Sequence, residues 1–86
     1  MKYRSRTDIS REILQAASNG TSKTKIMYAT YLSFAQLKEY LAALSESGLL
    51  EYDAERTEYR TTPKGKQFLQ VYDNMAMLTG ELREIR

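Results

Sequence analysis

The sequence predicts a small α+β domain that is mostly helical, with its elements in the order α-α-α-β-β-α. Three observations support this fold class. Apolar residues recur at three- and four-residue spacing over most of the chain. The spacing changes to two between residues 50 and 61. Small polar residues suited to helix caps stand before each helical segment. A chain of 86 residues allows one domain, which we place at residues 1–86.

The helix boundaries follow from these caps and from the residues that end a helix. The predicted N-caps are Thr7 or Asp8 before residues 8–18, Thr21 or Ser22 before residues 22–30, Ser33 before residues 33–47, and Thr62 before residues 63–86. Asn19 and Gly20 end the first helix, because glycine suits the left-handed position just past a helix. Ile26 and Met27 are the expected inward residues of the second helix.

The third helix has the best-defined start. Ser33 and Gln36 have the spacing of a capping box, in which each side chain accepts a hydrogen bond from the backbone N–H of the other. Its buried stripe is predicted to consist of Leu37, Leu41 and Leu44. The first two turns also carry polar and aromatic side chains that cannot all be buried, so this helix is expected to present them to a partner.

Residues 50–61 are predicted to form a β-hairpin. Leu50 and Tyr52 alternate with acidic residues, and Tyr59 and Thr61 alternate with charged ones. Residues 53–57 separate the two runs and form the expected turn. The pattern predicts a hairpin with one buried face.

The last helix begins at Thr62-Pro63, since proline suits the first helical position, and extends about 36 Å if it reaches residue 86. Apolar residues follow at spacings of three and four, which are heptad a and d positions: Phe68, Val71, Met75, Leu78, Leu82 and Ile85. The start of this stripe can cover the core, but the rest lies too far along the helix. We therefore predict a homodimer through a coiled coil formed by Val71, Met75, Leu78, Leu82 and Ile85.

Composition excludes several classes of function. The chain has no cysteine and no histidine, so it lacks thiol nucleophiles, the usual general base and the commonest metal ligands. We expect no enzymatic activity, no cofactor, no metal site and no small-molecule ligand. No apolar run reaches the length of a membrane span, and the N-terminus lacks the apolar region of a signal peptide. The expected location is the cytoplasm.

The charge distribution points to nucleic acid more than the net charge does. The net charge is only +2, but residues 1–25 contain six Lys or Arg residues and two acidic residues. A local basic patch is typical of nucleic-acid binding, and it also occurs on ordinary solvated surfaces.

The order of elements, with a strongly capped third helix followed by a hairpin, describes a winged helix-turn-helix. The motifs KTKIMY, LSFAQLKEYL, GLLEY and TTPKG resemble those of the archaeal winged helix-turn-helix domain family, over about residues 7–72. That family includes ArnR-like regulators and the ten-kilodalton "a" chromatin proteins of Sulfolobus. The resemblance implies binding of double-stranded DNA, with helix 33–47 as the recognition helix. In the chromatin branch, the long last helix pairs as an antiparallel coiled coil.

In this motif the early residues of the recognition helix reach base edges in the major groove. The predicted DNA-binding residues are Lys23, Lys25, Ser33, Phe34, Gln36, Lys38, Tyr40, Arg56, Arg4 and Arg6. Gln36 either bonds adenine or only completes the capping box. Phe34 either touches a thymine methyl or lies at the rim of the core. Glu39 repels phosphate, although it could accept a hydrogen bond from cytosine.

The cations differ in their expected roles. Lys23 and Lys25, at the start of the second helix, are the best candidates for phosphate contacts. Lys38 contacts phosphate or is simply solvated, and the Tyr40 ring packs while its hydroxyl reaches a phosphate. Arg4 and Arg6 belong to a basic arm that either follows a groove or is frayed. Arg56 is the single cation of the expected turn, among acidic neighbours.

Two functions of different class remain open. The first is a DNA-binding protein, either an archaeal transcriptional regulator or a chromatin-associated protein, that binds duplex DNA as a homodimer. The second is a winged-helix module for protein–protein interaction that does not bind DNA. The acidic hairpin turn, Glu39 and the low net charge favour the second function.

Overall fold

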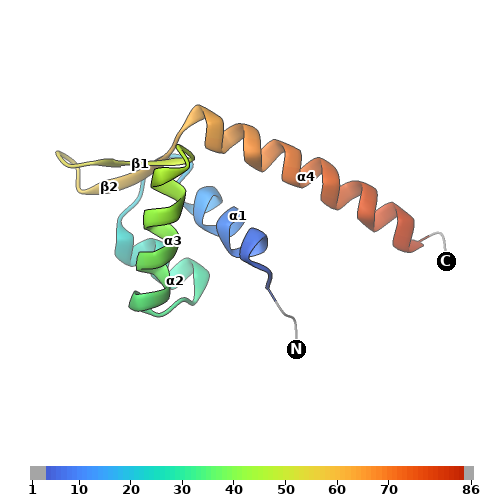
Figure 1. Cartoon of the computed structure of the whole chain (residues 1–86), viewed down its shortest axis with the longest axis horizontal. Helices are drawn as coiled ribbons and strands as arrows, with labels where there is room; N and C mark the ends of the chain where they lie inside the picture. The colour runs from blue at the N-terminus through green and yellow to red at the C-terminus, as the bar shows by residue number, and fades with distance from the viewer. Residues whose placement is uncertain (1–3, 85–86) are drawn as a thin grey trace.

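The computed structural model of the protein describes residues 4–84, apart from the side chains of residues 76 and 79–84. Within this part, four helices and two strands follow one another: α1 (Arg6–Ala16), α2 (Lys23–Thr30), α3 (Phe34–Glu46), β1 (Leu50–Asp53), β2 (Glu58–Thr61) and α4 (Pro63–Glu84). The predicted fold class and element order are confirmed. Figure 1 shows α1, α2, α3 and the hairpin grouped together, with α4 projecting from the group.

The core lies between α1, α2, α3 and the base of the hairpin. Its buried members are Ile13, Leu14, Ala17, Ile26, Leu32, Leu37, Leu41, Leu44 and Leu50. The predicted α3 stripe is therefore buried, and so is Ile26, whereas Met27 is half-buried and packs against the core. Burying these side chains is what holds three short helices together, because an isolated helix of eight to thirteen residues is marginal in water.

The N-cap of α1 is Ser5, and the predicted caps Thr7 and Asp8 are wrong. The Ser5 hydroxyl accepts a hydrogen bond from the Asp8 backbone N–H, and the Asp8 carboxylate accepts one from the Ser5 N–H, each at 3.0 Å. This capping box satisfies two backbone donors at once, which explains why α1 begins before residue 8. It ends at Ala16, two residues before the predicted end, and Gly20 follows with φ +88°.

The helix starts predicted for α2 and α3 are confirmed. Ser22 caps α2, and Ser33 caps α3 in a capping box with Gln36. The turn between these helices is short because Tyr31 adopts the left-handed conformation, with φ +58°. Leu32 then turns inward and is buried. This compact turn fixes the N-terminus of α3 beside α2.

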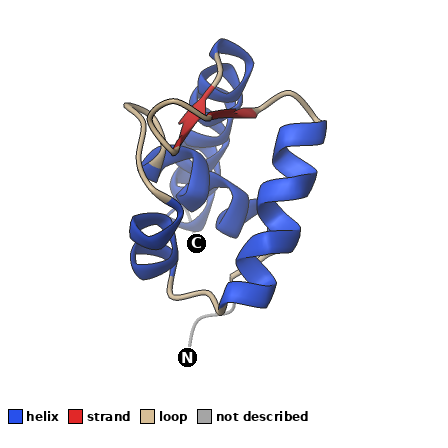
Figure 2. Cartoon of the chain, turned by 90° about the vertical axis from the view of Figure 1, so that its left-hand side faces the viewer, coloured by secondary structure: helices blue, strands red, loops and turns tan. Residues whose placement is uncertain are grey.

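The hairpin is confirmed, with Leu50 opposite Thr61 and Asp53 opposite Glu58 in an antiparallel pair. Its predicted buried face is only partly correct. Leu50 and Thr61 are buried at the base, but Tyr52 is 50% exposed and packs on Tyr59 at a ring distance of 4.9 Å. The reason is that the core ends at the base of the strands, so the hairpin extends beyond it at one end of the helices (Figure 2).

The start of α4 is fixed by Thr62 and by a glycine. The Thr62 hydroxyl accepts a hydrogen bond from the Gly65 N–H at 3.0 Å and donates one to the Gly48 carbonyl at 2.6 Å. A Cβ on Gly65 would lie 2.2 Å from the Leu49 carbonyl oxygen, so only glycine allows α4 to pass this close to the chain entering β1. Phe68 and Leu69 then pack against the core.

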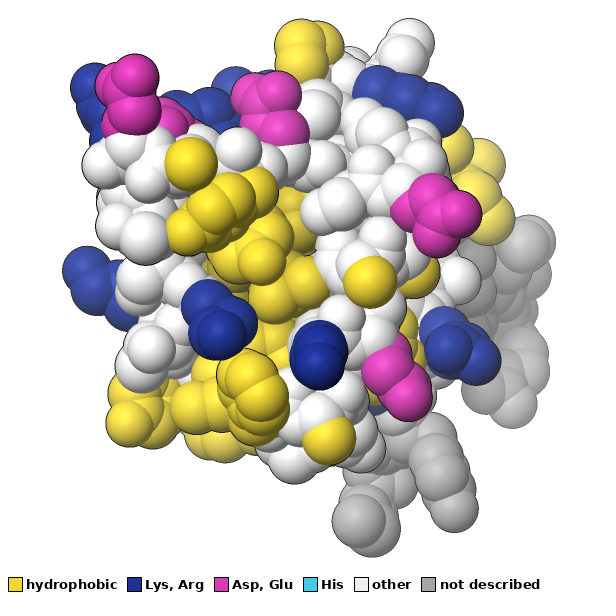
Figure 3. Space-filling model, turned by 60° about the vertical axis from the view of Figure 1, so that its left-hand side comes forward, with side chains coloured by type: hydrophobic (Ala, Val, Ile, Leu, Met, Phe, Trp, Pro, Cys, Tyr) yellow, Lys and Arg dark blue, Asp and Glu magenta, His cyan; other side chains and the backbone are white. Residues whose placement is uncertain are grey.

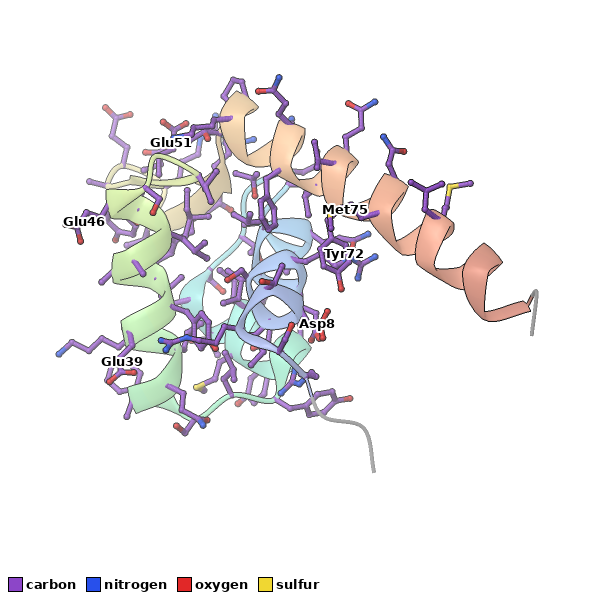
Figure 4. All side chains as sticks on the ribbon, turned by 45° about the vertical axis from the view of Figure 1, so that its right-hand side comes forward. Asp8, Glu39, Glu46, Glu51, Tyr72 and Met75 are labelled. Atoms are coloured by element: carbon purple, nitrogen blue, oxygen red, sulfur yellow. The ribbon has the colours of Figure 1, made fainter. Side chains whose placement is uncertain are left out.

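A polar cluster joins α4 to α1 beyond the core. The Tyr72 hydroxyl donates a hydrogen bond to Asp8, and Figure 4 shows these two side chains between the two helices. Arg11 lies over the Tyr72 ring at 5.6 Å and pairs with Asp73 at 3.7 Å. The Tyr72 and Ser5 hydrogen bonds hold the pKa of Asp8 below its ordinary value, and the bond to Asp8 raises the pKa of Tyr72.

None of the helices in the described part of the chain is both long enough and apolar enough to span a bilayer. The longest, α4, has 22 residues, but polar and charged side chains occur throughout it.

Candidate nucleic-acid interface

The starts of α2 and α3 meet on one face of the molecule. Lys23 is the first residue of α2 and Phe34 the first of α3. The Lys23 ammonium lies 4.5 Å from the centre of the Phe34 ring, and both side chains are exposed. Lys25 is the third residue of α2 and is also exposed. Each helix therefore presents its N-terminal end, where the helix dipole favours anions, next to a lysine.

The predicted capping role of Gln36 is confirmed. Its Oε1 accepts a hydrogen bond from the Ser33 backbone N–H at 3.1 Å, and the Ser33 hydroxyl accepts one from the Gln36 N–H at 3.2 Å. Both side chains are exposed. The amide oxygen of Gln36 therefore uses one of its two acceptor positions in the cap, and its NH2 group takes no part in that bond. Contact with a base stays a prediction for this residue.

The remaining candidate residues line two separate grooves, and α3 contributes to both of them. Lys38 lines one groove together with Lys23 and Phe34. Tyr40 lines the other groove, with Arg6 and Glu39, between α3, α1 and α4. The Tyr40 ring is half-buried and packs against the core, as predicted, and Arg6 lies 5.8 Å from its centre. The structure thus brings Lys23, Phe34 and Lys38 together and places Tyr40 apart from them.

The predicted basic arm is not a free arm in the described residues. Arg4 is bound within the chain: its guanidinium pairs with Glu12 at 2.8 Å and donates to the Thr30 carbonyl at 2.6 Å. Arg6 lies inside α1 and is exposed. The alternative of a frayed segment is also wrong from residue 4 onward, because these bonds fix Arg4 to the C-terminal end of α2.

The hairpin turn carries more negative than positive charge. Asp53 accepts hydrogen bonds from the backbone N–H groups of Glu55 and Arg56, at 3.0 and 3.2 Å. Its other oxygen lies 4.0 Å from Arg56, so the one cation of the turn already faces a carboxylate. Figure 3 shows a central band of hydrophobic side chains with cationic side chains beside it, acidic side chains toward the top and right, and one acidic side chain between cationic ones at the lower right.

The sequence did not predict several exposed aromatic residues near α3, or three of the residues that line its groove. Tyr28 and Tyr31 are strongly exposed near the turn between α2 and α3. Ala42, Ser45 and Tyr59 complete the groove that contains Phe34 and Lys38. Helical spacing from Phe34 could have found the two α3 residues, because positions 34, 38, 42 and 45 share one side of a helix. Tyr59 carried no such signal, because it comes from β2.

The predicted dimerisation residues lie on α4 away from the core where the structure describes them. Val71, Met75 and Leu78 are 54%, 62% and 62% exposed. The side chain of Leu82 and the whole of Ile85 lie outside the described residues. Within the described residues, no group of three acidic, His or Cys side chains is arranged to bind a metal ion.

Three helices, a turn that places α3 on the surface and a hairpin beside it define a winged helix-turn-helix protein. The chain belongs to the winged helix-turn-helix family, whose model matches residues 3–80, and the predicted resemblance is confirmed. A solved structure with a similar fold is that of Sso10a-2, a DNA-binding protein from Sulfolobus solfataricus. The TM-score is 0.83 and the identity 21%, over 95% of this chain and 88% of that one. No curated protein gives a significant match.

Proposed function

We propose that this protein binds double-stranded DNA without catalysing a reaction, with the first two turns of α3 in the major groove. The observation that carries this proposal is the shared face of the two helix starts, where Lys23 and Lys38 line one groove with Phe34 and Lys25 is exposed in the first turn of α2. Residues 13–38 contain no acidic residue at all. Membership of the winged helix-turn-helix family and the similarity to a DNA-binding protein support the same conclusion.

Each protomer is expected to contact phosphates chiefly through three lysines. Within the described residues, Lys23, Lys25 and Lys38 form no ion pair, so their charges are available to a ligand. Three neutralised phosphates give a slope of log K against log[salt] of about −3, and six give about −5. The slope therefore reports whether one or both protomers of a dimer engage a single duplex.

We further infer that the protein is a homodimer held by α4. The exposed Val71, Met75 and Leu78 support this inference, because an apolar stripe on a projecting helix is typical of an interface. The heptad spacings of three, four, three, four and three read the same in both directions. Two copies can therefore pair antiparallel with Met75 opposite Leu78. The α3 helices of the two copies then belong to two separate winged-helix units.

Charge reversal tests the DNA-binding face. The double variant Lys23→Glu, Lys25→Glu is expected to bind a labelled duplex of about 30 base pairs more weakly for every sequence, with a salt slope reduced by about 2 for each protomer engaged. The control is Lys66→Glu, an exposed cation in the first turns of α4. Unchanged affinity in the double variant, or an equal loss in the control, would refute this footprint.

A matched pair of α4 variants tests the dimer. Leu78→Glu places a charge on the apolar stripe and is expected to give a monomer in sedimentation equilibrium. Met77→Glu changes a side chain that is 67% exposed but outside the heptad positions, and it should remain a dimer. If both variants keep the wild-type mass, α4 is not the interface.

A transcriptional regulator and a chromatin-associated protein would share this binding mode and differ in selectivity. A regulator protects a few sites in footprinting of long fragments, whereas a chromatin protein covers them uniformly.

The second candidate function is a protein-interaction module. The acidic hairpin turn favours it. Arg56 is the one cation among residues 53–58, and it already faces the carboxylate of Asp53. It predicts no duplex binding at about 100 mM salt, with an α4 complex that persists.

A further inference from the structure

The groove beside α3 contains apolar and aromatic surface in addition to the lysines proposed to contact a duplex. It has a volume of about 300 Å³, at the lower limit of ligand-sized pockets, and lies between α3, the start of α2 and β2. Its lining consists of Lys23, Phe34, Lys38, Leu41, Ala42, Ser45 and Tyr59. None of these side chains is acidic. The floor is apolar and the two aromatic rings come from different elements.

Base edges of a duplex find few partners in this groove. Paired and stacked bases offer only the donors and acceptors of their edges, and Ser45 is the one neutral side chain of α3 in the lining that can hydrogen-bond. Leu41 is nearly buried, and Ala42 adds a methyl group. An apolar floor with an aromatic wall suits the flat face of a base, which is accessible only when the base is unpaired.

The lysines of the groove suit the phosphates on either side of such a base. The Lys23 ammonium lies over the Phe34 ring, which is 54% exposed. A base that stacks on this ring displaces the ammonium, and the flexible lysine stem lets it follow the neighbouring phosphate. Lys38, one turn further along α3, can meet the phosphate on the other side.

We propose that this groove binds unpaired bases of a single-stranded nucleic acid, with a base stacked on Phe34 and its flanking phosphates held by Lys23 and Lys38. This binding mode goes beyond duplex binding and does not depend on it. The combination of stacking rings with a cationic border is the general means by which proteins bind single strands without reading their sequence.

The test compares single-strand and duplex binding in two matched variants. Phe34→Leu removes the ring but keeps an apolar side chain that can still touch a thymine methyl. Tyr31→Leu removes a ring that is 88% exposed and lies outside the groove lining. The ligands are labelled oligo-dT and oligo-rU of about 12 nucleotides and a duplex of about 30 base pairs, titrated by fluorescence anisotropy at about 50 mM salt.

Phe34→Leu is expected to weaken single-strand binding about fivefold or more, as loss of one stacked base requires, and to weaken duplex binding less, because leucine keeps an apolar contact but cannot stack. Tyr31→Leu should leave both unchanged, and Lys38→Gln should weaken single-strand binding and lower its salt slope by about 1. The ratio of the oligo-dT and oligo-rU affinities identifies DNA or RNA as the better ligand. Circular dichroism of each variant checks that the fold is kept.

Two results would overturn the proposal: no binding of either oligonucleotide by the wild type, or equal losses for single strand and duplex in Phe34→Leu. A protein that binds single strands through Phe34 but fails to bind the duplex would support this inference and refute the proposed function. Duplex binding without single-strand binding would do the reverse.

Discussion

Gln36 is the residue whose two predicted roles can be separated most sharply. A bidentate contact with adenine needs both the oxygen and the NH2 group of the amide. The structure places that oxygen in the capping box, where it accepts a hydrogen bond from the Ser33 N–H at 3.1 Å. Capping and bidentate reading therefore share one acceptor atom, and the cap fixes how the amide is oriented. The substitution Gln36→Glu keeps an acceptor for the box and removes the donor that adenine requires.

The magnitudes follow from the exposed position of the box. Gln36→Glu should unfold with a free energy within about 0.5 kcal/mol of the wild type, because a carboxylate in the first turn also suits the helix dipole. Ser33→Ala removes the cap and should cost about 1 kcal/mol, or roughly 4–8 °C in Tm for a domain of this size. Ser45→Ala, an exposed serine of the same helix, is the control and should not lower stability.

The assay is urea unfolding at a fixed protein concentration, combined with selection of binding sites from randomised duplexes. If Gln36 reads a base, Gln36→Glu loses the preference for adenine at one position by about 1–3 kcal/mol while the stability is kept. If Gln36 only caps, the preferred site is the same in both proteins. The account of the capping box itself fails if Ser33→Ala is as stable as the wild type.

Three further predictions concern contacts that hold the fold in place. Gly65→Ala should cost about 3 kcal/mol in urea unfolding because its Cβ would lie 2.2 Å from the Leu49 oxygen, whereas Gly48→Ala, with φ +78° but open space, should cost about 1 kcal/mol; equal costs would contradict this. Arg4→Ala should cost about 1–2 kcal/mol by removing two hydrogen bonds of a charged group, and Arg6→Ala about 0.5 kcal/mol; the reverse order would refute the role of Arg4. Asp8→Asn should lower stability at pH 7 and by less at about pH 2: the folded pKa of Asp8 lies below its ordinary 3.8, so its contribution is complete above that pH and is lost as the pH falls through the folded pKa. A difference that is the same at both pH values would exclude this contribution.

The sequence was most informative where one local interaction decides the structure. Ser22, Ser33 with Gln36, and Thr62 each cap the helix that was expected. The start of α1 follows the same rule: Ser5 and Asp8 have capping-box spacing, whereas the predicted caps Thr7 and Asp8 are the residues just before Ile9. That boundary was therefore predictable from the sequence.

Contacts between distant segments could not be predicted in this way. Arg4 bonds the carbonyl of Thr30, 26 residues away, and nothing in the residues near either position indicates that pairing. The exposure of Tyr52 depends on where the core ends, which an alternating pattern does not specify. The groove at Phe34 needs Tyr59 from β2 and Lys23 from α2, so it exists only once three elements are assembled.

The low net charge of the protein is a weak argument against nucleic-acid binding, because salt screens the charges that lie far from a bound phosphate. At physiological salt the Debye length is about 8 Å, so a phosphate at the start of α3 senses mainly the side chains around it. There it meets Lys23, Lys25 and Lys38 within a stretch of 26 residues that has no acidic residue. The carboxylates that lower the net charge lie on the hairpin, on α1 and α4, and also on α3 at Glu39 and Glu46. The carboxylates of the hairpin limit how far DNA can extend over it, whereas on α3 only Glu39 directly follows one of the three lysines.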